Sequence, residues 1–175
     1  MKKSWILISL VIISVAIWGC AHRKASTSPP TASAPVPEIT PSPCGASLKI
    51  EWQHVYHPDR LVVREQCKVV TGVIDSVRSE PDGDFHVRLA LDPGQENLLN
   101  EKNMSVQHGD LVIEPICEHP ATQTDAIAWC ENFAGGVPRP RKGMRVRVAG
   151  SYVHDVGRGH GWNEIHPAVL IEEIQ

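Results

Sequence analysis

The stretch that decides the fold is Val69-Val70-Thr71-Gly72-Val73-Ile74-Asp75-Ser76-Val77. Its β-branched residues favour a long strand, and Gly72 predicts a bulge or sharp bend where a side chain would not fit. The turn-forming residues Glu80–Asp84 follow. Phe85–Leu91 then alternates apolar and polar residues, as expected for a half-buried strand. The folded part therefore contains a long bent strand that is paired with a shorter one.

The rest of the chain supplies the other elements of a mainly β domain. A short β-prone run precedes the hairpin and three strands follow it, at residues 61–63, 111–116, 144–153 and 164–174, the last interrupted by Pro167. Thr122–Phe133 is helix-like, with Thr124 as a candidate N-cap. A glycine bend and a helix between strands three and four are typical of the OB-fold, a five-stranded Greek-key barrel. An immunoglobulin-like sandwich is the alternative, but the helix counts against it.

The N-terminus has the layout of an export signal. Lys2 and Lys3 precede an apolar stretch, Trp5–Trp18, which is short for a membrane-spanning helix of roughly 20 residues. The stretch closes with Ile17-Trp18-Gly19-Cys20, which resembles a bacterial lipobox, although Trp18 stands where a small or aliphatic residue is usual. We expect a lipoprotein-type signal or anchor at 1–20, with lipid attached to Cys20. An uncleaved signal anchor and a cleaved signal that releases a soluble domain are the alternatives.

A linker separates this segment from the domain. Residues 21–43 are rich in Pro, Ser, Thr and Ala and could not build a core, which predicts a disordered spacer. The domain at 44–175 carries 13 Lys and Arg against 19 Asp and Glu. This acidic balance disfavours a general nucleic-acid binder, because phosphate neutralisation supplies most of that affinity. We expect a single domain in the cell envelope, outside the cytoplasm.

Four cysteines remain for the domain: Cys44, Cys67, Cys117 and Cys130. An even number in an exported domain predicts two disulfides. Three pairings are open. Cys117 and Cys130 could meet locally, and Cys44 would then join the start of the domain to Cys67. The absence of any CxxC pair disfavours a zinc site of four thiolates, and free thiols in one pair are the other alternative.

Several stretches between residues 55 and 171 carry a family resemblance. They are Tyr56-His57-Pro58-Asp59-Arg60-Leu61, Pro81-Asp82-Gly83-Asp84-Phe85-His86, Leu89–Pro93, Gly109-Asp110-Leu111-Val112 and His160-Gly161-Trp162-Asn163-Glu164-Ile165-His166-Pro167. They look like a group of uncharacterised secreted or membrane-anchored microbial proteins. The resemblance implies an OB-like barrel but no settled activity, and it carries over no catalytic residue. In general shape the domain is also similar to periplasmic bacterial OB-fold proteins, which are mostly binding or stress-related.

The most unusual local composition lies between residues 154 and 166. Its candidate binding residues are His154, Asp155, His160, Trp162, Asn163, Glu164 and His166. A glycine-rich hairpin could bring the three histidines together, and three imidazoles can hold zinc with an open position for water, with Glu164 as base. Our first expectation for this segment is nevertheless structural: Trp162 covers one barrel mouth while Glu164 and His166 make buried hydrogen bonds, and a binding surface is the alternative. Histidines six residues apart match no standard metal spacing, so we expect no metal and keep zinc as the alternative.

Two further features are candidates for binding. His86 lies on the polar face of the second strand and could join the cluster, although an exposed position on the barrel surface is our expectation for it. Arg145 and Arg147 continue a basic run along the fourth strand. They are candidate contacts for an anionic ligand, namely a glycan, a lipid headgroup or extracellular DNA. A solvated charged face is our first expectation for this run, and anion binding is the alternative.

These patterns favour a function without enzymatic chemistry. The sequence has no GxSxG elbow and no Gly-rich phosphate loop, and its cysteines look structural. We predict a membrane-anchored binding or envelope-accessory protein whose ligand and protein partner the sequence does not identify. The alternative is a metal-dependent hydrolase or nuclease that uses the His154–His166 hairpin, and a purely structural tether partner is a third class.

Overall fold

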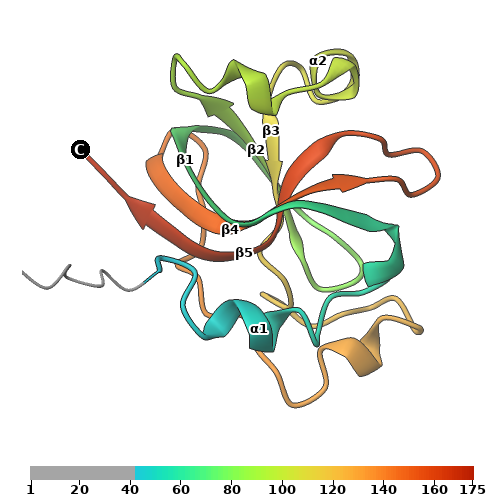
Figure 1. Cartoon of the computed structure of the whole chain (residues 1–175). Coiled ribbons are helices and arrows are strands. Elements are labelled where there is room, and N and C mark those ends of the chain that lie inside the picture. Colours follow the sequence, from blue (N-terminus) through green and yellow to red (C-terminus); the bar gives the residue numbers. More distant parts are fainter. Residues whose placement is uncertain (1–41) are drawn as a thin grey trace, which may run out of the picture. The chain divides into compact units, whose positions relative to one another are not determined.

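A five-stranded sheet that closes into a ring organises residues 42–175, the part of the chain that the computed structural model describes (Figure 1). The strands follow one another around the ring in the order β1-β2-β3-β5-β4. Neighbours are antiparallel except β3 and β5, which run parallel. The bounds are β1 (Leu61–Ser79), β2 (Phe85–Leu91), β3 (Leu111–Ile113), β4 (Arg145–Asp155) and β5 (Asn163–Glu173). The mainly β prediction with five strands is confirmed.

Strand β1 is the element that closes the ring. It pairs with β4 over Leu61–Val73 and with β2 over Gly72–Ser79, so the two runs predicted at 61–63 and 69–77 are one strand of 19 residues. A Cβ added at Gly72 would overlap the backbone oxygen of Ala90 on β2. The expectation that no side chain fits there is therefore confirmed. The register itself shifts a little further on, between Ile74 and Ser76.

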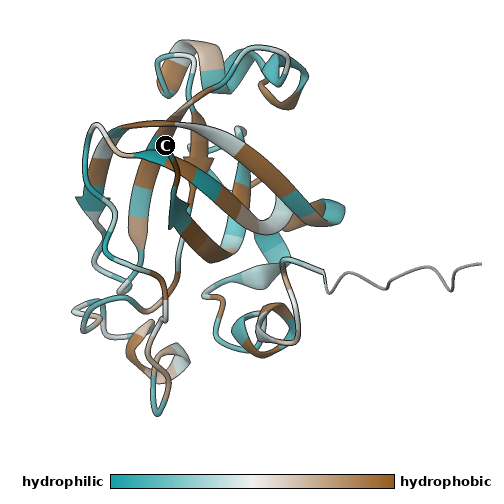
Figure 2. Cartoon of the chain, turned by 90° about the vertical axis from the view of Figure 1, so that its left-hand side faces the viewer, coloured by the Kyte–Doolittle hydropathy of each residue, from teal (hydrophilic) through white to brown (hydrophobic). Residues whose placement is uncertain are grey.

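Side chains that alternate along the strands fill the interior of the ring. Phe85, Val87 and Leu89 of β2 are almost fully buried, as their alternation predicts. They pack with core residues of the other four strands, among them Val70, Leu111, Val148 and Ile165. Figure 2 shows hydrophobic and hydrophilic residues alternating along the ribbon of the sheet.

A second apolar cluster lies on the outer side of the sheet. Val153 of β4 packs there with Leu61 at the start of β1, with Val55 before β1, and with Ile116 and Cys117 after β3. The segments before β1 and after β3 therefore cover part of the outer surface of the ring. This cover buries side chains on the outer face of the sheet that would otherwise be exposed to water.

The helical elements are short and differ from those expected. They are α1 (Ser47–Glu51), α2 (Glu101–Val106) and three 3₁₀ turns, η1 (Pro58–Arg60), η2 (Glu96–Leu98) and η3 (Ile127–Trp129). The predicted helix at 122–133 between strands three and four is wrong, since η3 is the helical element there. Asn100 caps α2, between β2 and β3, through a reciprocal pair of hydrogen bonds with Asn103.

Tertiary contacts explain why the 122–133 segment does not form a helix. The backbone N–H groups of Thr122 and Gln123 donate to the carbonyl of Pro81 in the β1–β2 turn. The Tyr56 hydroxyl donates to Asp125 at 2.6 Å. The side chain of Ile127 is 50% exposed, so it is not packed as the buried face of a helix would be. Contacts to distant segments therefore fix this stretch as an irregular loop.

Strand β5 continues past Pro167, where an interruption was predicted. In the pairing with β4, Gly150 faces Ala168 and Tyr152 faces Ile165. Between these two pairs β5 contains one residue more than β4, so the register shifts at this point. Proline has no backbone N–H to donate, and it is tolerated at such an irregularity because the regular hydrogen bonding between the strands is already interrupted there. The His166–Pro167 peptide bond is cis.

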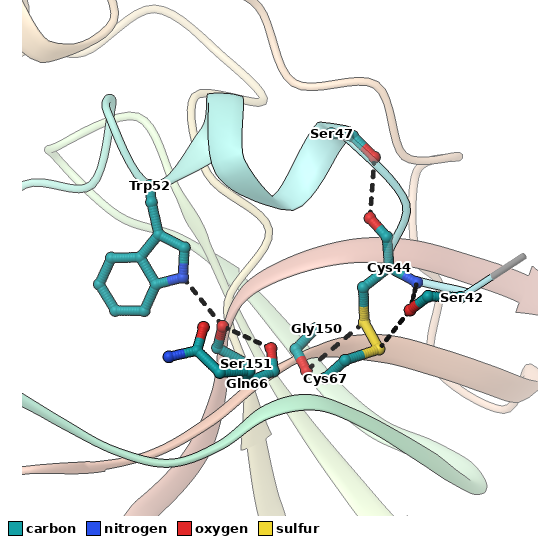
Figure 3. The surroundings of a disulfide bond; sticks show 8 residues. All are labelled: Ser42, Cys44, Ser47, Trp52, Gln66, Cys67, Gly150 and Ser151. Atoms are coloured by element: carbon teal, nitrogen blue, oxygen red, sulfur yellow. Dashed lines mark hydrogen bonds between the residues drawn. A yellow bond between two sulfur atoms is a disulfide. The ribbon is translucent and has the colours of Figure 1, made fainter.

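Two disulfides join Cys44 to Cys67 and Cys117 to Cys130. The first holds the start of the domain against β1 (Figure 3). Next to it, the Trp52 indole N–H donates to the Ser151 hydroxyl of β4 at 2.9 Å. Of the pairings left open by the sequence, the local one is therefore the one found.

The predicted signal or anchor at 1–20, with Cys20, lies outside the described residues, as does nearly all of the linker at 21–43. Within residues 42–175, none of the helices has the length and apolar character needed to cross a membrane.

Candidate functional site

Alternation places a row of polar side chains on the outer face of β2, β3 and β5. Val87 pairs with Ile113, and Ile113 pairs with Ile165, and all three are buried in the interior of the ring. Their sequence neighbours therefore point to the opposite face. These neighbours are His86, Glu114, Glu164 and His166, and each is at most 8% exposed. Four ionisable side chains thus share one buried patch.

Glu114 lies at the centre of this patch. One of its carboxylate oxygens is 3.0 Å from Nδ1 of His86, and the other is 2.9 Å from Nδ1 of His166. The same nitrogen of His166 is 3.0 Å from Oε1 of Glu164. The indole N–H of Trp162 donates to the second oxygen of Glu164 at 2.7 Å. We call these five residues the buried network.

The histidines and Glu114 stabilise one another in their charged forms. Burial lowers the pKa of His86 and of His166, but the hydrogen bonds and charges of their carboxylate partners outweigh it. The pKa of His86 is raised, and that of His166 lies well above its usual value. Burial raises the pKa of Glu114, yet the hydrogen bonds from His166 and His86 bring it well below the usual value.

The other carboxylates nearby are less well compensated. Burial and the charge of Glu114 raise the pKa of Glu164. Burial raises the pKa of Asp84 to about 7 and also raises that of Asp82. Three carboxylates near the histidines, those of Asp82, Asp84 and Glu164, thus lie in surroundings that disfavour their charged form.

A polar pocket of about 310 Å³ opens beside the buried network. Its walls come from the segment before β1, the β1–β2 turn, the loop after β3 and the β4–β5 hairpin. His86, Glu114 and Trp162 of the network also line it. The remaining lining residues mix cationic, acidic and neutral hydrogen-bonding groups: His57, Arg60, Arg78, His160, Glu80, Asp82, Tyr56 and Gln123.

Asp155 holds the β4–β5 hairpin against this pocket. Its carboxylate is fully buried and accepts hydrogen bonds from the backbone N–H of Gly157 and from Nδ1 of His160, both at 2.6 Å. Nε of Arg60 lies 3.3 Å from the same carboxylate. Asp155 therefore positions two pocket residues, one from the hairpin and one from the segment before β1.

His154 and Asn163 take part in a different set of contacts. Nδ1 of His154 is 3.0 Å from Oδ1 of Asn163. The Asn163 side-chain amide donates to Leu98 O and to the Tyr152 hydroxyl, and its backbone N–H donates to Asn103 in α2. These contacts connect β5 to the segment around α2 and give Asn163 a structural role.

The three histidines proposed for zinc do not converge. Within residues 42–175, His154, His160 and His166 do not bring ligand atoms within 4.8 Å of one another. Each ring instead bonds a different acceptor, namely Asn163, Asp155 and the Glu114–Glu164 pair. The three-imidazole arrangement that was kept as the alternative is therefore not formed among the described residues.

The expectation that His86 is exposed is wrong. Only 6% of its surface is accessible, because the outer face of β2 is covered at this position. Trp162 packs edge-on against its ring, with ring centroids 5.9 Å apart. His86 does join part of the predicted cluster, since Glu114 connects it to His166.

The basic run along β4 is largely neutralised. Arg145 makes two hydrogen bonds to Asp92, at 2.9 and 2.7 Å, and Arg147 makes two to Glu172, at 2.9 and 2.6 Å. Lys142 pairs with Asp75 at 3.3 Å. The charges of Arg145, Arg147 and Lys142 are thus each paired with a carboxylate at the surface.

Of the residues that line the pocket, only His86, His160 and Trp162 were candidates from the sequence. Most of the lining was missed, including Arg78, Glu80 and Glu114. A signal for several others was present. Three of the stretches that suggested the family resemblance, at 56–61, 81–86 and 160–167, each contribute residues to the pocket. Taken together, these three stretches could have been proposed as parts of one site, although no single stretch indicates it.

Two groups of described residues have the ligand types and spacing to hold a metal ion. One is Asp84 with Cys117 and Cys130, but these cysteines are joined in a disulfide and offer no thiolate. The other is Asp84 with Glu114 and His166, all of them buried. Comparison with known protein families, curated proteins and solved structures finds no match for this chain.

Proposed function

We propose that residues 44–175 form an OB-type barrel that acts as a binding module. The strand order around the ring, with β3 parallel to β5, supports this assignment, as does a first strand that bends to pair with both β2 and β4. The segment between β3 and β4 holds the short turn η3 in place of a helix. The stretches that resemble secreted or membrane-anchored microbial proteins fit the same assignment.

The position of the pocket is the observation that carries the binding function. OB-folds bind oligonucleotides and oligosaccharides on the face of strands two and three, between the loop that joins strands one and two and the loop that joins strands four and five. The pocket takes Glu80 and Asp82 from the first of these loops, His160 and Trp162 from the hairpin, and His86 from β2. This position supports a binding role, because it corresponds to the place where OB-folds receive their ligands.

The lining favours a saccharide over a nucleic acid. Its cationic side chains are balanced by carboxylates, and Arg60 and Arg78 already pair with Asp155 and Glu80. A polyanion needs an excess of positive charge, which neither the pocket nor the acidic domain offers. Paired donors and acceptors beside aromatic rings suit the hydroxyl groups of a sugar. We propose an oligosaccharide of the cell envelope as the ligand.

The N-terminal segment and the cysteines support a location in the cell envelope. A lipid on Cys20 would anchor the chain at a membrane, and the linker at 21–43 would hold the domain off its surface. Two disulfides in a small domain support an oxidising compartment outside the cytoplasm. Together they favour a membrane-anchored binding protein of the cell envelope.

The test is titration calorimetry on the full chain in detergent. The probes are N-acetylglucosamine oligomers, uronic acid oligomers and a short single-stranded DNA. We expect a saccharide to bind and Arg78→Gln to weaken that binding, because Arg78 lines the pocket. Arg147→Gln is the matched control, since it removes an arginine with a carboxylate partner elsewhere on the surface.

Two results would contradict the proposal. One is binding of DNA alone, with an affinity that falls steeply as salt is raised. The other is a saccharide affinity that Arg147→Gln lowers as much as Arg78→Gln does, because the ligand would then not lie in the pocket.

A further inference from the structure

A second pocket adjoins the one described above. It also has a volume of about 310 Å³, and Arg78 and His86 line both pockets. The floor of the second pocket is the outer face of β1 and β2, where Arg78 pairs with His86 and Ser76 pairs with Arg88. Its wall comes from the end of α2 and the two residues that follow that helix. A chain-like ligand in the first pocket can therefore continue along the sheet into the second.

The second pocket differs from the first in the charge of its lining. Glu80, Asp82 and Glu114 line the first pocket, whereas no carboxylate among residues 42–175 lines the second. The second is lined by two arginines, two histidines, a serine, a glutamine and Val106. Apart from the apolar Val106, each of these side chains can donate a hydrogen bond. The second pocket thus suits a ligand group that only accepts hydrogen bonds.

Gln107 offers an unused donor to this pocket. Its side-chain oxygen is 3.2 Å from Nε2 of His86, and Nδ1 of His86 is 3.0 Å from the Glu114 carboxylate. Burial lowers the pKa of His86, but the hydrogen bond to Glu114 outweighs it and the pKa is raised. Protonated His86 donates from both nitrogens, so the oxygen of Gln107 faces it and the amide NH₂ turns away. This NH₂ has no hydrogen-bond partner within residues 42–175, yet it is not among the fully buried atoms there that lack one.

Ser76 offers a second donor. Nε of Arg88 donates to the Ser76 hydroxyl oxygen at 2.7 Å. The hydroxyl therefore acts as an acceptor toward Arg88, and its own proton stays available to an acceptor in the pocket. His108 lies in the wall, and its side chain is exposed. Donors thus come from the sheet and from the segment after α2.

The carboxylate partners of the two arginines stay outside this lining. Arg88 pairs with Asp75, and its Nη1 lies 3.9 Å from Asp110, but neither carboxylate lines the second pocket. Glu80, the partner of Arg78, lines only the first. A ligand in the second pocket therefore meets the arginines without meeting a carboxylate, which favours a group with a single negative charge.

We infer that the second pocket binds the carboxylate of an acidic sugar unit while a neutral unit of the same chain occupies the first. The inference rests on the proposed saccharide binding and narrows the ligand to oligosaccharides that contain a uronic acid. A single carboxylate needs no large excess of cations, unlike the polyanion that the lining of the first pocket disfavours. Val106 is 45% exposed and offers a contact for the apolar face of the sugar ring.

The experiment is titration calorimetry on the full chain in detergent with two matched tetrasaccharides. One carries a single terminal uronic acid, and in the other this carboxylate is reduced to a primary alcohol. We expect the acidic form to bind at least about tenfold more tightly, because hydrogen bonds to an ionised acceptor are roughly twice as strong. Gln107→Glu should remove this preference, since it keeps an oxygen for His86 and replaces the NH₂ with a negative charge. Gln66→Glu is the matched control, because it adds the same charge at an exposed residue of β1 outside both pockets.

His108→Asn is a second variant, because its side chain is exposed and Asn tolerates the left-handed backbone at this position, where φ is 61°. It should weaken binding of the acidic form more than binding of the reduced form. It decides the question if near-ultraviolet circular dichroism shows that Gln107→Glu does not fold.

Three results would overturn the inference: equal affinity of the wild type for the two tetrasaccharides, a preference that survives in the folded variants of Gln107 and His108, or a preference that Gln66→Glu also removes. Equal binding of both tetrasaccharides leaves the proposed function standing. If neither tetrasaccharide binds and N-acetylglucosamine oligomers do not bind either, the proposed function itself fails.

Discussion

Replacement of Glu114 by Gln tests whether the buried network depends on charge. The substitution keeps the shape of the side chain and removes the negative charge that both histidines face. His86 and His166 each have a ring nitrogen within 3.0 Å of a Glu114 oxygen. The amide of Gln can accept from one of them, but its NH₂ group then faces the other. The variant therefore leaves at least one buried imidazole poorly paired.

The magnitude follows from the partners that remain. Removing one member of a buried ion pair costs about 3–5 kcal/mol. His166 keeps Glu164 at 3.0 Å, and His86 keeps Gln107 at 3.2 Å. We therefore expect the lower end, about 3 kcal/mol. For a domain of this size the melting temperature should fall by roughly 10 °C.

The assay is thermal and urea unfolding of the full chain in detergent, followed by tryptophan fluorescence, with a chelator present so that metal binding does not contribute. Glu65→Gln is the control, because Glu65 makes an exposed pair with Lys68 and should change stability little. A loss below about 1 kcal/mol for Glu114→Gln would show that the charge of Glu114 stabilises the fold no more than a surface ion pair does.

Three other predictions concern the frame around the site. Gly72→Ala should be strongly destabilising, because the added Cβ would overlap the backbone of Ala90. Gly136→Ala is the control and should be neutral or slightly stabilising, because no atom lies within 4 Å of the added Cβ. Equal urea midpoints for the two variants would contradict the close contact at Gly72. Joint replacement of Cys117 and Cys130 by Ser removes a disulfide that closes a loop with a sequence separation of 13. The free energy of unfolding, measured with urea, should fall by about 3 kcal/mol. An unchanged urea midpoint would count against the disulfide. Burial and the charge of Glu118 raise the pKa of Glu51 to about 7, so the folded state keeps a proton that the unfolded state releases. Stability should therefore fall as pH rises from about 4.5 to 7, and Glu51→Gln should reduce that fall; identical pH profiles of the two proteins would show that Glu51 is not responsible.

The sequence predicts the strands well where the pattern is local. Phe85–Leu91 is found with the bounds expected, because its alternation and its turn residues are both contained in the stretch itself. The helix at 122–133 is not found, because contacts to Pro81 and Tyr56, distant in sequence, fix that segment in another conformation. The break expected between 63 and 69 is absent because β4 pairs with the whole region.

The candidate site is predicted only in part for a related reason. A period of two places His86 on the outer face of β2 but does not reveal that other segments cover that face. Glu114 becomes central through the parallel pairing of β3 with β5, which no local pattern indicates. His160, Trp162, Glu164 and His166 could be proposed from the sequence because they lie in one compositionally unusual hairpin. The sequence does not reveal that His154 bonds to Asn163, which is itself held by Asn103 of α2.

Saccharide binding by the pocket beside the buried network can be observed directly at Trp162. The most direct test is the nuclear magnetic resonance signal of the tryptophan indole N–H groups, in full-length protein labelled at tryptophan, during titration with the oligosaccharide that binds. Trp162 lines the pocket, while the Trp52 indole is bonded to Ser151 next to the Cys44–Cys67 disulfide (Figure 3). We predict that the Trp162 signal shifts in proportion to the bound fraction and that the Trp52 signal stays in place. A shift of Trp52 alone, or of neither signal at saturation, would contradict the claim.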